Sequence, residues 1–432
     1  MAPARDRVVD LVRAASIVVV VLGHWTMGAV SRDASGEVSV SNVLEVTPLL
    51  HPATWVLQVM PLFFFAAGFA NATSLWHGRP LRLFLTGRLD RVLRPVLPFL
   101  GIWLALAVLL PAVGVGPDLV RAAGANAAMV LWFLAVYLLL SLVAPAQAKL
   151  HVSHPWLLLG VLPPLVLGLD QLQDTAWAGV GLVNYVVVFA FCQQLGMLYA
   201  DGRLQALPRS TWWLGGAGAL ALLVLATGPG PYPVSMIGLP GQEMSNMLPP
   251  SVCVVLVGVL QVSLVMLATP TLQHLLERPR VWAITVAVNL TILTVFLWHV
   301  TAFVVVAAAA LALGVPLPEV GSALWWAHKL VWVVACAAVT TAIVLMLRGA
   351  ERPRPVLAPA RFAVPATELA VAGLAMVAAA GFAEPLTSGG VALGGLRFAA
   401  APGAVLVVAG LLLGKRPAVS TVPAPRQPVP EG

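Results

Sequence analysis

The stretch RVVDLVRAASIVVVVLGHW, from Arg7 to Trp25, combines a charged beginning with a long apolar middle. Roughly 17–25 apolar residues are enough for a helix to cross a bilayer. The whole chain has this character, because 60% of its 432 residues are hydrophobic and 9% are charged, against roughly 25% charged residues in a soluble domain. One soluble core could not bury so much apolar surface. The sequence therefore predicts an integral membrane protein embedded in the lipid bilayer.

Apolar stretches of this length recur along the chain, and Pro, Gly or basic residues separate them. Twelve candidates predict an all-α, polytopic transmembrane bundle of about 12 helices. They lie at approximately residues 8–30, 52–75, 95–115, 123–147, 155–170, 178–199, 211–228, 249–270, 284–313, 324–347, 364–382 and 398–414.

Basic residues set the expected orientation of this bundle. With the N-terminus in the cytoplasm, only Arg32, Arg121, Arg397 and the borderline Lys329 fall on the outer side, and the other Lys and Arg residues fall on the inner side. This is the positive-inside pattern, and it predicts a multi-pass protein of the cell membrane with both termini cytoplasmic. The net charge of +7 is therefore a matter of topology, and we expect no nucleic-acid partner.

Arg13 and His24 stand out in the first helix. Their separation of eleven residues brings both side chains onto one stripe, roughly 16 Å apart along the axis. Asp10 lies three residues before Arg13 and can pair with it. A histidine within the membrane usually faces a bundle interior or a cavity. The pattern fits a functional site, and it equally fits an interfacial anchor with a histidine bonded to a neighbouring helix.

The chain also resembles the acyltransferase 3 family, through five elements in family order over about residues 5–347. Ala67 stands where the family usually has serine in the second element. A further segment from Tyr232 to Ser251 resembles an actinobacterial-type subgroup. The five elements are Asp10-Leu-Val-Arg13 with His24, Met60-Pro-Leu-Phe-Phe-Phe65-Ala-Ala-Gly68-Phe69, Arg88-Leu-Asp90-Arg91-Val-Leu-Arg94-Pro95, Leu131-Trp132-Phe133-Leu134 with Tyr137, and Phe296-Leu297-Trp298-His299.

The resemblance implies a ten-helix acyltransferase domain at residues 5–347. A cytoplasmic linker at 348–363, two additional helices at 364–414 and a disordered tail at 415–432 would follow it. It implies a membrane-bound O-acyltransferase that uses acyl-CoA, commonly acetyl-CoA, as co-substrate, with no permanently bound cofactor. The acceptor would be a hydroxyl of a carbohydrate, a lipid-linked molecule or another component of the cell envelope.

Site residues follow from the same elements. His24 is the candidate general base or transient acyl carrier, since the pKa of an imidazole is near neutrality. Arg13 and His299 complete the predicted catalytic group. The other predictions are Arg88, Arg91 and Arg94 in a basic loop as donor-phosphate ligands, with Asp10, Trp132 and Tyr137 in support.

Several readings remain open. A basic loop can simply set topology, and His299 could orient His24, line the acceptor path or join helices. We expect His51, His328 and Lys329 to be interfacial and His151 to lie in a cytoplasmic connection. No histidine pair has convincing zinc-ligand spacing with carboxylates, so no metal is predicted.

A secondary transporter is the alternative, because twelve helices with both termini inside also describe many transporters. Proton or sodium coupling usually needs acidic residues within the membrane. Asp170, Asp174 and Glu243 fall in predicted outer loops, and Asp10 and Glu368 lie at helix ends. The acyltransferase reading is therefore favoured.

Overall fold

The computed structural model describes residues 6–32, 38–172, 178–239, 244–347, 349, 360–382, 392–393, 396–397 and 399–415. Ten helical segments in these ranges are long and apolar enough to cross a membrane, and two apolar helices, Leu157–Asp170 and Ala400–Gly414, are shorter. Each of the twelve predicted spans coincides with one of these segments. The structure thus confirms the polytopic helical bundle.

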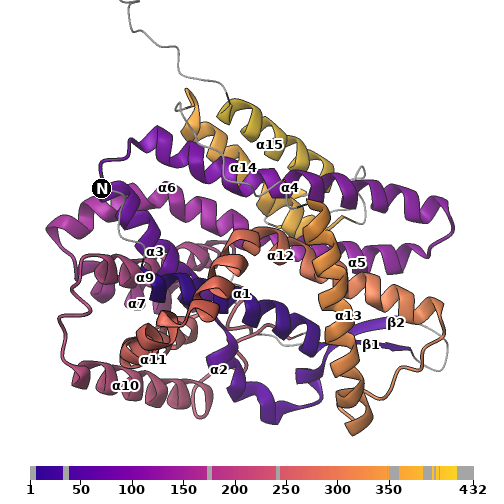
Figure 1. The fold of residues 1–432 in the computed structure, drawn as a ribbon, viewed down its shortest axis with the longest axis horizontal. Helices are drawn as coiled ribbons and strands as arrows, with labels where there is room; N and C mark the ends of the chain where they lie inside the picture. Colours follow the sequence, from indigo (N-terminus) through magenta and orange to yellow (C-terminus); the bar gives the residue numbers. More distant parts are fainter. Residues whose placement is uncertain are drawn as a thin grey trace, which may run out of the picture.

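Helices make up most of the fold, and two small hairpins accompany them (Figure 1). In chain order the elements are α1 (Arg7–Met27), β1 (Gly28–Arg32), β2 (Val38–Asn42), the 3-10 helices η1 (Val43–Glu45) and η2 (Pro48–Ala53), α2 (Thr54–Leu57), α3 (Met60–Trp76), α4 (Leu81–Ala112), α5 (Pro117–Met129), α6 (Leu131–Ser153), α7 (Leu157–Asp170), α8 (Ala178–Gly181), α9 (Asn184–Ala200), α10 (Arg209–Thr227), α11 (Val252–Glu277), α12 (Pro279–Ala312), α13 (Ala323–Leu347), α14 (Ala363–Ala380), β3 (Ala392–Leu393), β4 (Leu396–Arg397) and α15 (Ala400–Gly414).

Helix α1 lies inside the bundle and packs against α3, α11, α12 and α13 (Figure 1). It begins where the Asp6 carboxylate accepts a hydrogen bond from the backbone N–H of Val9 (2.9 Å), which satisfies one free donor of the first turn. Its C-terminus runs directly into β1, which pairs with β2 in antiparallel register from Gly28 opposite Asn42 to Arg32 opposite Val38. The residues after α1 therefore form a hairpin that is followed by the 3-10 turns η1 and η2.

The contact between α3 and α9 depends on two glycines. A Cβ atom at Gly68 would overlap the carbonyl of Gln193, and one at Gly196 would overlap the carbonyl of Phe65. Small residues let membrane helices approach closely. This contact brings polar side chains of α3 and α9 within hydrogen-bonding reach of each other.

The predicted basic loop is wrong, because Arg88, Arg91 and Arg94 all lie within α4. Arg and Leu have high helix propensity, and Pro80 gives the helix a defined start. Prolines within membrane helices are tolerated when neighbouring groups satisfy the freed carbonyls, so Pro95 does not end the helix. As a result the arginines have fixed positions on a helix that packs against α6 and α12.

The two helices after residue 360 pack onto the core. Helix α14 contacts α6, α4 and α5, and α15 contacts α14 and α4 (Figure 1). Phe382, which follows α14, is fully buried, and its ring stacks on Trp103 with centroids 5.8 Å apart. Most of the predicted linker at 348–363 and nearly all of the predicted tail at 415–432 lie outside the described residues.

The segment between α10 and α11 is ordered where the structure describes it. Trp55 Nε1 donates to the carbonyl of Val234 (2.8 Å), and Tyr232 donates its hydroxyl to buried Asp170 (2.9 Å). Burial and the Asp170 carboxylate raise the pKa of the Tyr232 phenol well above its ordinary value, so the phenol remains a donor.

Candidate active site

Arg13 is tied to both α1 and α12. Its Nε donates to Asn289 Oδ1 (2.6 Å), and its guanidinium pairs with Asp10 (3.2 Å). The Asn289 amide in turn donates to the carbonyl of Asp10 (2.9 Å) and to that of Thr285 (2.9 Å). The predicted Asp10–Arg13 pair is thus present, and Asn289 fixes it against the helix that carries His299.

His24 and His299 are direct neighbours across the α1–α12 contact. The rings have centroids 4.9 Å apart, and His299 Nε2 lies 3.3 Å from His24 Nδ1. His24 Nδ1 also lies 2.8 Å from the carbonyl of Val20, and His299 Nδ1 lies 2.6 Å from that of Phe296. The structure therefore brings together two histidines that are 275 residues apart.

These contacts determine the neutral tautomers. A carbonyl oxygen only accepts, so Nδ1 carries the hydrogen in both rings. His299 Nε2 then has a lone pair that faces the same Nδ1–H of His24, so this hydrogen is shared between the carbonyl of Val20 (2.8 Å) and His299 Nε2 (3.3 Å). His24 Nε2 has the remaining lone pair of its ring, and this nitrogen can accept a proton.

The C-terminal end of α1 is held by α13. Lys329 donates to the carbonyls of Trp25 and Gly28, and its ammonium lies 4.5 Å from the centroid of the Trp325 ring. Lys329 is buried, with 6% of the residue exposed, and its place at the membrane interface stays a prediction. The last carbonyls of a helix lack intrahelical donors, and the long lysine side chain reaches them.

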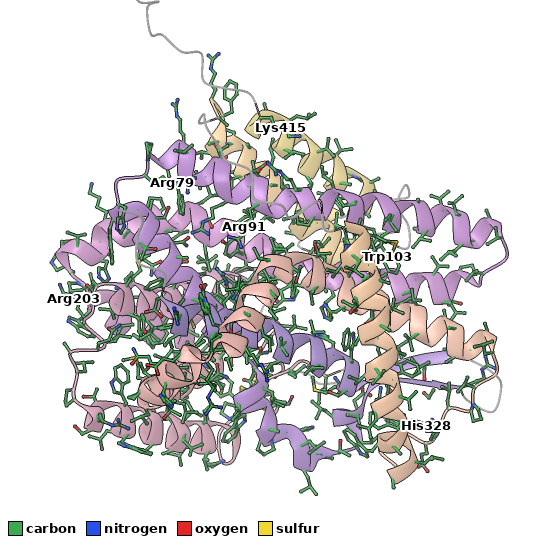
Figure 2. All side chains as sticks on the ribbon, in the orientation of Figure 1. Arg79, Arg91, Trp103, Arg203, His328 and Lys415 are labelled. Atoms are coloured by element: carbon green, nitrogen blue, oxygen red, sulfur yellow. The ribbon has the colours of Figure 1, made fainter. Side chains whose placement is uncertain are left out.

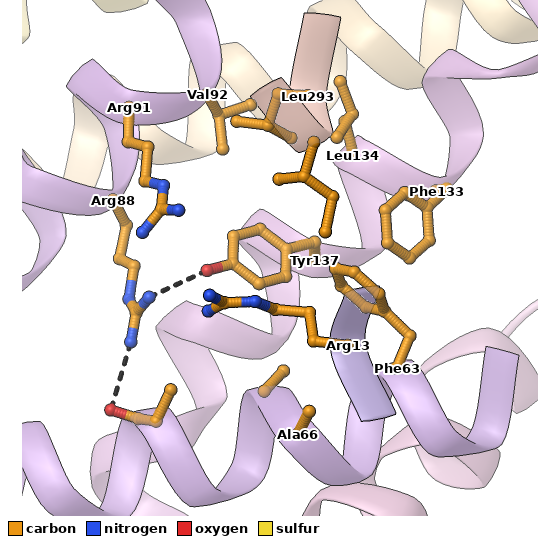
Figure 3. Close-up of a pocket in the computed structure, with 13 residues that line it drawn as sticks. Arg13, Phe63, Ala66, Arg88, Arg91, Val92, Phe133, Leu134, Tyr137 and Leu293 are labelled. Atoms are coloured by element: carbon orange, nitrogen blue, oxygen red, sulfur yellow. Dashed lines mark hydrogen bonds between the residues drawn. The ribbon is translucent and has the colours of Figure 1, made fainter. Parts of the chain in front are cut away.

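Three guanidinium groups converge in a cavity between α1, α3, α4, α6 and α12 (Figure 3). Arg13, Arg88 and Arg91 line it, together with Tyr137 and apolar side chains. Its unfilled space is about 510 Å³, counted out to the open mouth. None of the lining residues is acidic, so the cavity favours an anionic ligand.

The two α4 arginines of the cavity differ in their contacts. Arg88 donates to the Tyr137 hydroxyl (2.9 Å), to Asn71 Oδ1 (2.8 Å) and to the carbonyl of Ala70 (3.2 Å). Arg91 is exposed, and among the described residues it has no hydrogen-bond or ion-pair partner. Arg88 is therefore held in place, whereas Arg91 is available to a ligand.

Two predicted site residues lie elsewhere. Arg94 pairs with Asp90, and both face a separate cavity bounded by α4 and α15. Trp132 packs on Tyr185, with ring centroids 5.5 Å apart, and does not line the arginine cavity. A spacing of three residues turns a helix by about 300°, so Arg88, Arg91 and Arg94 point in progressively different directions.

Aromatic rings connect the arginine cavity with the histidines. Phe63 and Phe133 line the cavity and lie 4.7 Å apart. Phe133 lies 4.9 Å from Phe296, whose ring is 5.7 Å from that of His299. These phenylalanines lie within three of the five elements quoted from the sequence, but no role was predicted for them, because apolar residues in membrane helices give no signal of their own.

His151 was predicted to lie in a connection between helices, but the structure places it within α6. It lies in the last turn of α6, with only 2% of its side chain exposed, and pairs with Asp201 (2.9 Å). Its spacing of four residues from Gln147 on one helix face was the available signal. In the described part of the chain, no group of three or more His, Cys, Asp or Glu side chains could hold a metal ion.

Basic side chains are distributed unevenly over the molecule. Arg79, Arg91 and Arg203 lie on the side of the N-terminus, and His328 lies at the opposite end (Figure 2). The β1–β2 hairpin, which follows the C-terminus of α1, also lies at this opposite end (Figure 1). Along α1, a cationic cavity is thus followed by a neutral histidine pair.

Comparison with known proteins agrees with this arrangement. A family model described as an acyltransferase domain, that of the acyltransferase 3 family, matches residues 6–348. No curated protein and no solved structure matches the chain. The match covers both the arginine cavity and the histidine pair and extends over most of the chain. This protein belongs to the acyltransferase 3 family and is a membrane O-acyltransferase.

Proposed function

We propose that this enzyme transfers an acyl group, in the first instance acetyl, from cytoplasmic acyl-CoA to a hydroxyl of a carbohydrate or other cell-envelope acceptor. The observation that carries the proposal is the placement of two sites on one helix. The arginine cavity lies at one end of α1 and the His24–His299 pair lies roughly 16 Å further along its axis.

The arginine cavity is suited to the phosphates of the donor. Guanidinium groups match phosphate geometry through paired N–H donors. Arg88 is oriented by three neutral acceptors, and Arg91 is free of protein partners among the described residues. Phe63, Phe133 and Phe296 form a continuous set of packed rings between the cavity and the histidines, and the pantetheine arm would pass along this apolar surface to reach them.

His24 Nε2 then acts as general base. It takes the proton of the acceptor hydroxyl, and the oxygen forms a bond to the thioester carbonyl. The carbon–sulfur bond breaks, and the CoA thiolate leaves and receives the proton. His299 stabilises the transient imidazolium of His24, because its Nε2 accepts from the Nδ1–H of His24. A transient acyl group on His24 Nε2 would use the same lone pair.

Purified protein in liposomes tests the proposal. We expect CoA release from acetyl-CoA that depends on added acceptor, and mass spectrometry of envelope glycans and lipids should show an acyl increment that disappears with the gene. Solute uptake without acyl-CoA, and no CoA release with any envelope extract, would instead indicate a transporter.

A further inference from the structure

A chain of hydrogen bonds leads from the arginine cavity through the bundle. It connects α4, α3, α9 and α6 and ends at the turn after α9. Every link is 3.3 Å or shorter. In order, Arg88 Nη2 donates to Asn71 Oδ1 (2.8 Å), Asn71 Nδ2 to Gln193 Oε1 (3.3 Å), Gln193 Nε2 to Gln147 Oε1 (2.9 Å), Gln147 Nε2 to Gln194 Oε1 (3.1 Å), Gln194 Nε2 to His151 Nδ1 (2.8 Å) and His151 Nε2 to Asp201 Oδ2 (2.9 Å).

The direction of this chain is fixed at both ends. A guanidinium has only donors and a carboxylate has only acceptors, so each group between Arg88 and Asp201 accepts on one side and donates on the other. Two carbonyls require the same direction. Gln147 also donates to the carbonyl of Ala190 (2.9 Å), and Gln194 donates to that of Pro155 (2.6 Å).

The members of this hydrogen-bond chain are buried in the bundle. Asn71, Gln147, Gln193 and Gln194 are all less than 5% exposed, and His151 is 2% exposed. Hydrogen bonds in a low-dielectric interior polarise one another, and unpaired members are costly. The orientation of each side-chain amide is therefore set by all the hydrogen bonds of this chain together. Asp201 itself is held by Arg203, whose Nε lies 2.7 Å from Oδ2.

The consequence falls on Arg88. Within the described residues no carboxylate contacts its guanidinium, which is directed by Asn71, Tyr137 and the carbonyl of Ala70. An adjacent carboxylate would hold the guanidinium but would also compete with an anionic ligand. A line of neutral amides orients Arg88 and leaves its charge available.

We propose that Gln193, Gln147 and His151 are positioning residues of the donor site, which hold Arg88 in the orientation that binds the anionic part of acyl-CoA. This rests on the proposed function. None of the three lines the arginine cavity, so they act through Arg88. The closing experiment uses purified full-length protein, acetyl-CoA and an acceptor-containing envelope extract.

Gln193→Met interrupts the chain with a side chain of similar size, and His151→Phe removes its far end. We expect each to raise the KM for acetyl-CoA about three- to tenfold, the effect of one net hydrogen bond, with kcat within about twofold of wild type. The matched control is Gln261→Met, because Gln261 is also buried but does not belong to this hydrogen-bond chain. It donates to the backbone carbonyls of Trp55, Val56 and Gln58. The Gln261→Met variant should have the same KM for acetyl-CoA as the wild type.

A double-mutant cycle separates positioning from packing. In an Arg88→Ala background, Gln193→Met should produce no further rise in KM, whereas additive effects would overturn the proposal. An unchanged KM in both single variants, with melting temperatures near wild type, would also overturn it. If wild-type protein releases no CoA from acetyl-CoA, the proposed function fails first. Active wild type with an unaffected KM in the variants rejects only the positioning role.

Discussion

The two polar sites along α1, at Arg13 and at His24, lie in contrasting surroundings. Arg13 lies in an open cavity with Arg88 and Arg91, beside a carboxylate and an amide. His24 lies against one other imidazole and a carbonyl, with aromatic rings between it and the cavity. A charged, open region suits binding of an anion, and a neutral, enclosed region suits proton transfer. The following substitutions test whether binding and chemistry divide in this way.

His24→Ala should have the largest effect. It removes the only base proposed for the acceptor hydroxyl, so kcat should fall by roughly 10²–10⁴-fold, the usual contribution of a general base. The KM for acetyl-CoA should change little, since His24 does not line the arginine cavity. Initial rates across a range of acetyl-CoA concentrations measure both. Normal turnover in correctly folded His24→Ala protein would remove His24 from the mechanism.

His299→Phe should have the next largest effect. It keeps an aromatic ring but removes the nitrogen that accepts from His24 Nδ1–H, so the imidazolium loses a partner. We expect kcat to fall about tenfold, as for the loss of one hydrogen bond to a charged group. His299→Gln can present an acceptor again and should recover part of the rate. Equal rates for the Phe and Gln variants would assign His299 to packing alone.

Arg91→Ala tests the other end of the comparison. The KM for acetyl-CoA should rise about tenfold with little change in kcat, because a guanidinium–phosphate contact contributes roughly 1.5–3 kcal/mol. Arg94→Ala is the matched control, since it removes an arginine from the same helix that faces Asp90 and a separate cavity. Equal KM values for the two variants would show that the cavity does not select the donor.

Much of this division could be predicted from the sequence. The twelve spans follow from apolar length, and the Arg13–Asp10 pair follows from helical periodicity. Figure 3 shows Arg13 of α1 beside Arg88 and Arg91 of α4, and helical periodicity could not predict that these residues of different helices meet. Whether His299 faces His24, and whether Arg94 shares a cavity with Arg91, depends on the rotation of α12 and α4 about their axes, which is set by packing with helices distant in sequence.

The burial of two polar side chains could not be predicted for the same reason. Lys329 lies near the start of α13 and His151 in the last turn of α6, and hydropathy gives no signal that either is buried. Both side chains are buried against partners that are distant in the sequence. Lys329 contacts carbonyls that follow His24 at the C-terminal end of α1, and His151 contacts Gln194 and Asp201. The predicted arginine loop is instead part of α4, because residues of high helix propensity continue the helix.

Lys329→Met should have the smallest effect and should act on the histidine end. Lys329 donates to the carbonyls of Trp25 and Gly28, on either side of the turn that follows His24. Trp25 Nε1 in turn donates to the carbonyl of His299 (2.8 Å). Methionine fills the volume but leaves both carbonyls without this donor. The free energy of unfolding should therefore fall by about 1–3 kcal/mol.

We therefore expect a lower melting temperature and a kcat reduced severalfold, with an unchanged KM for acetyl-CoA. Lys329→Arg should recover more of the rate than Lys329→Met, because it keeps a cationic donor at the same position. His328→Met controls for a substitution on the same helix. A rise in donor KM without loss of kcat would contradict the comparison, since it would connect the C-terminal end of α1 to the donor site and leave the histidine pair unaffected.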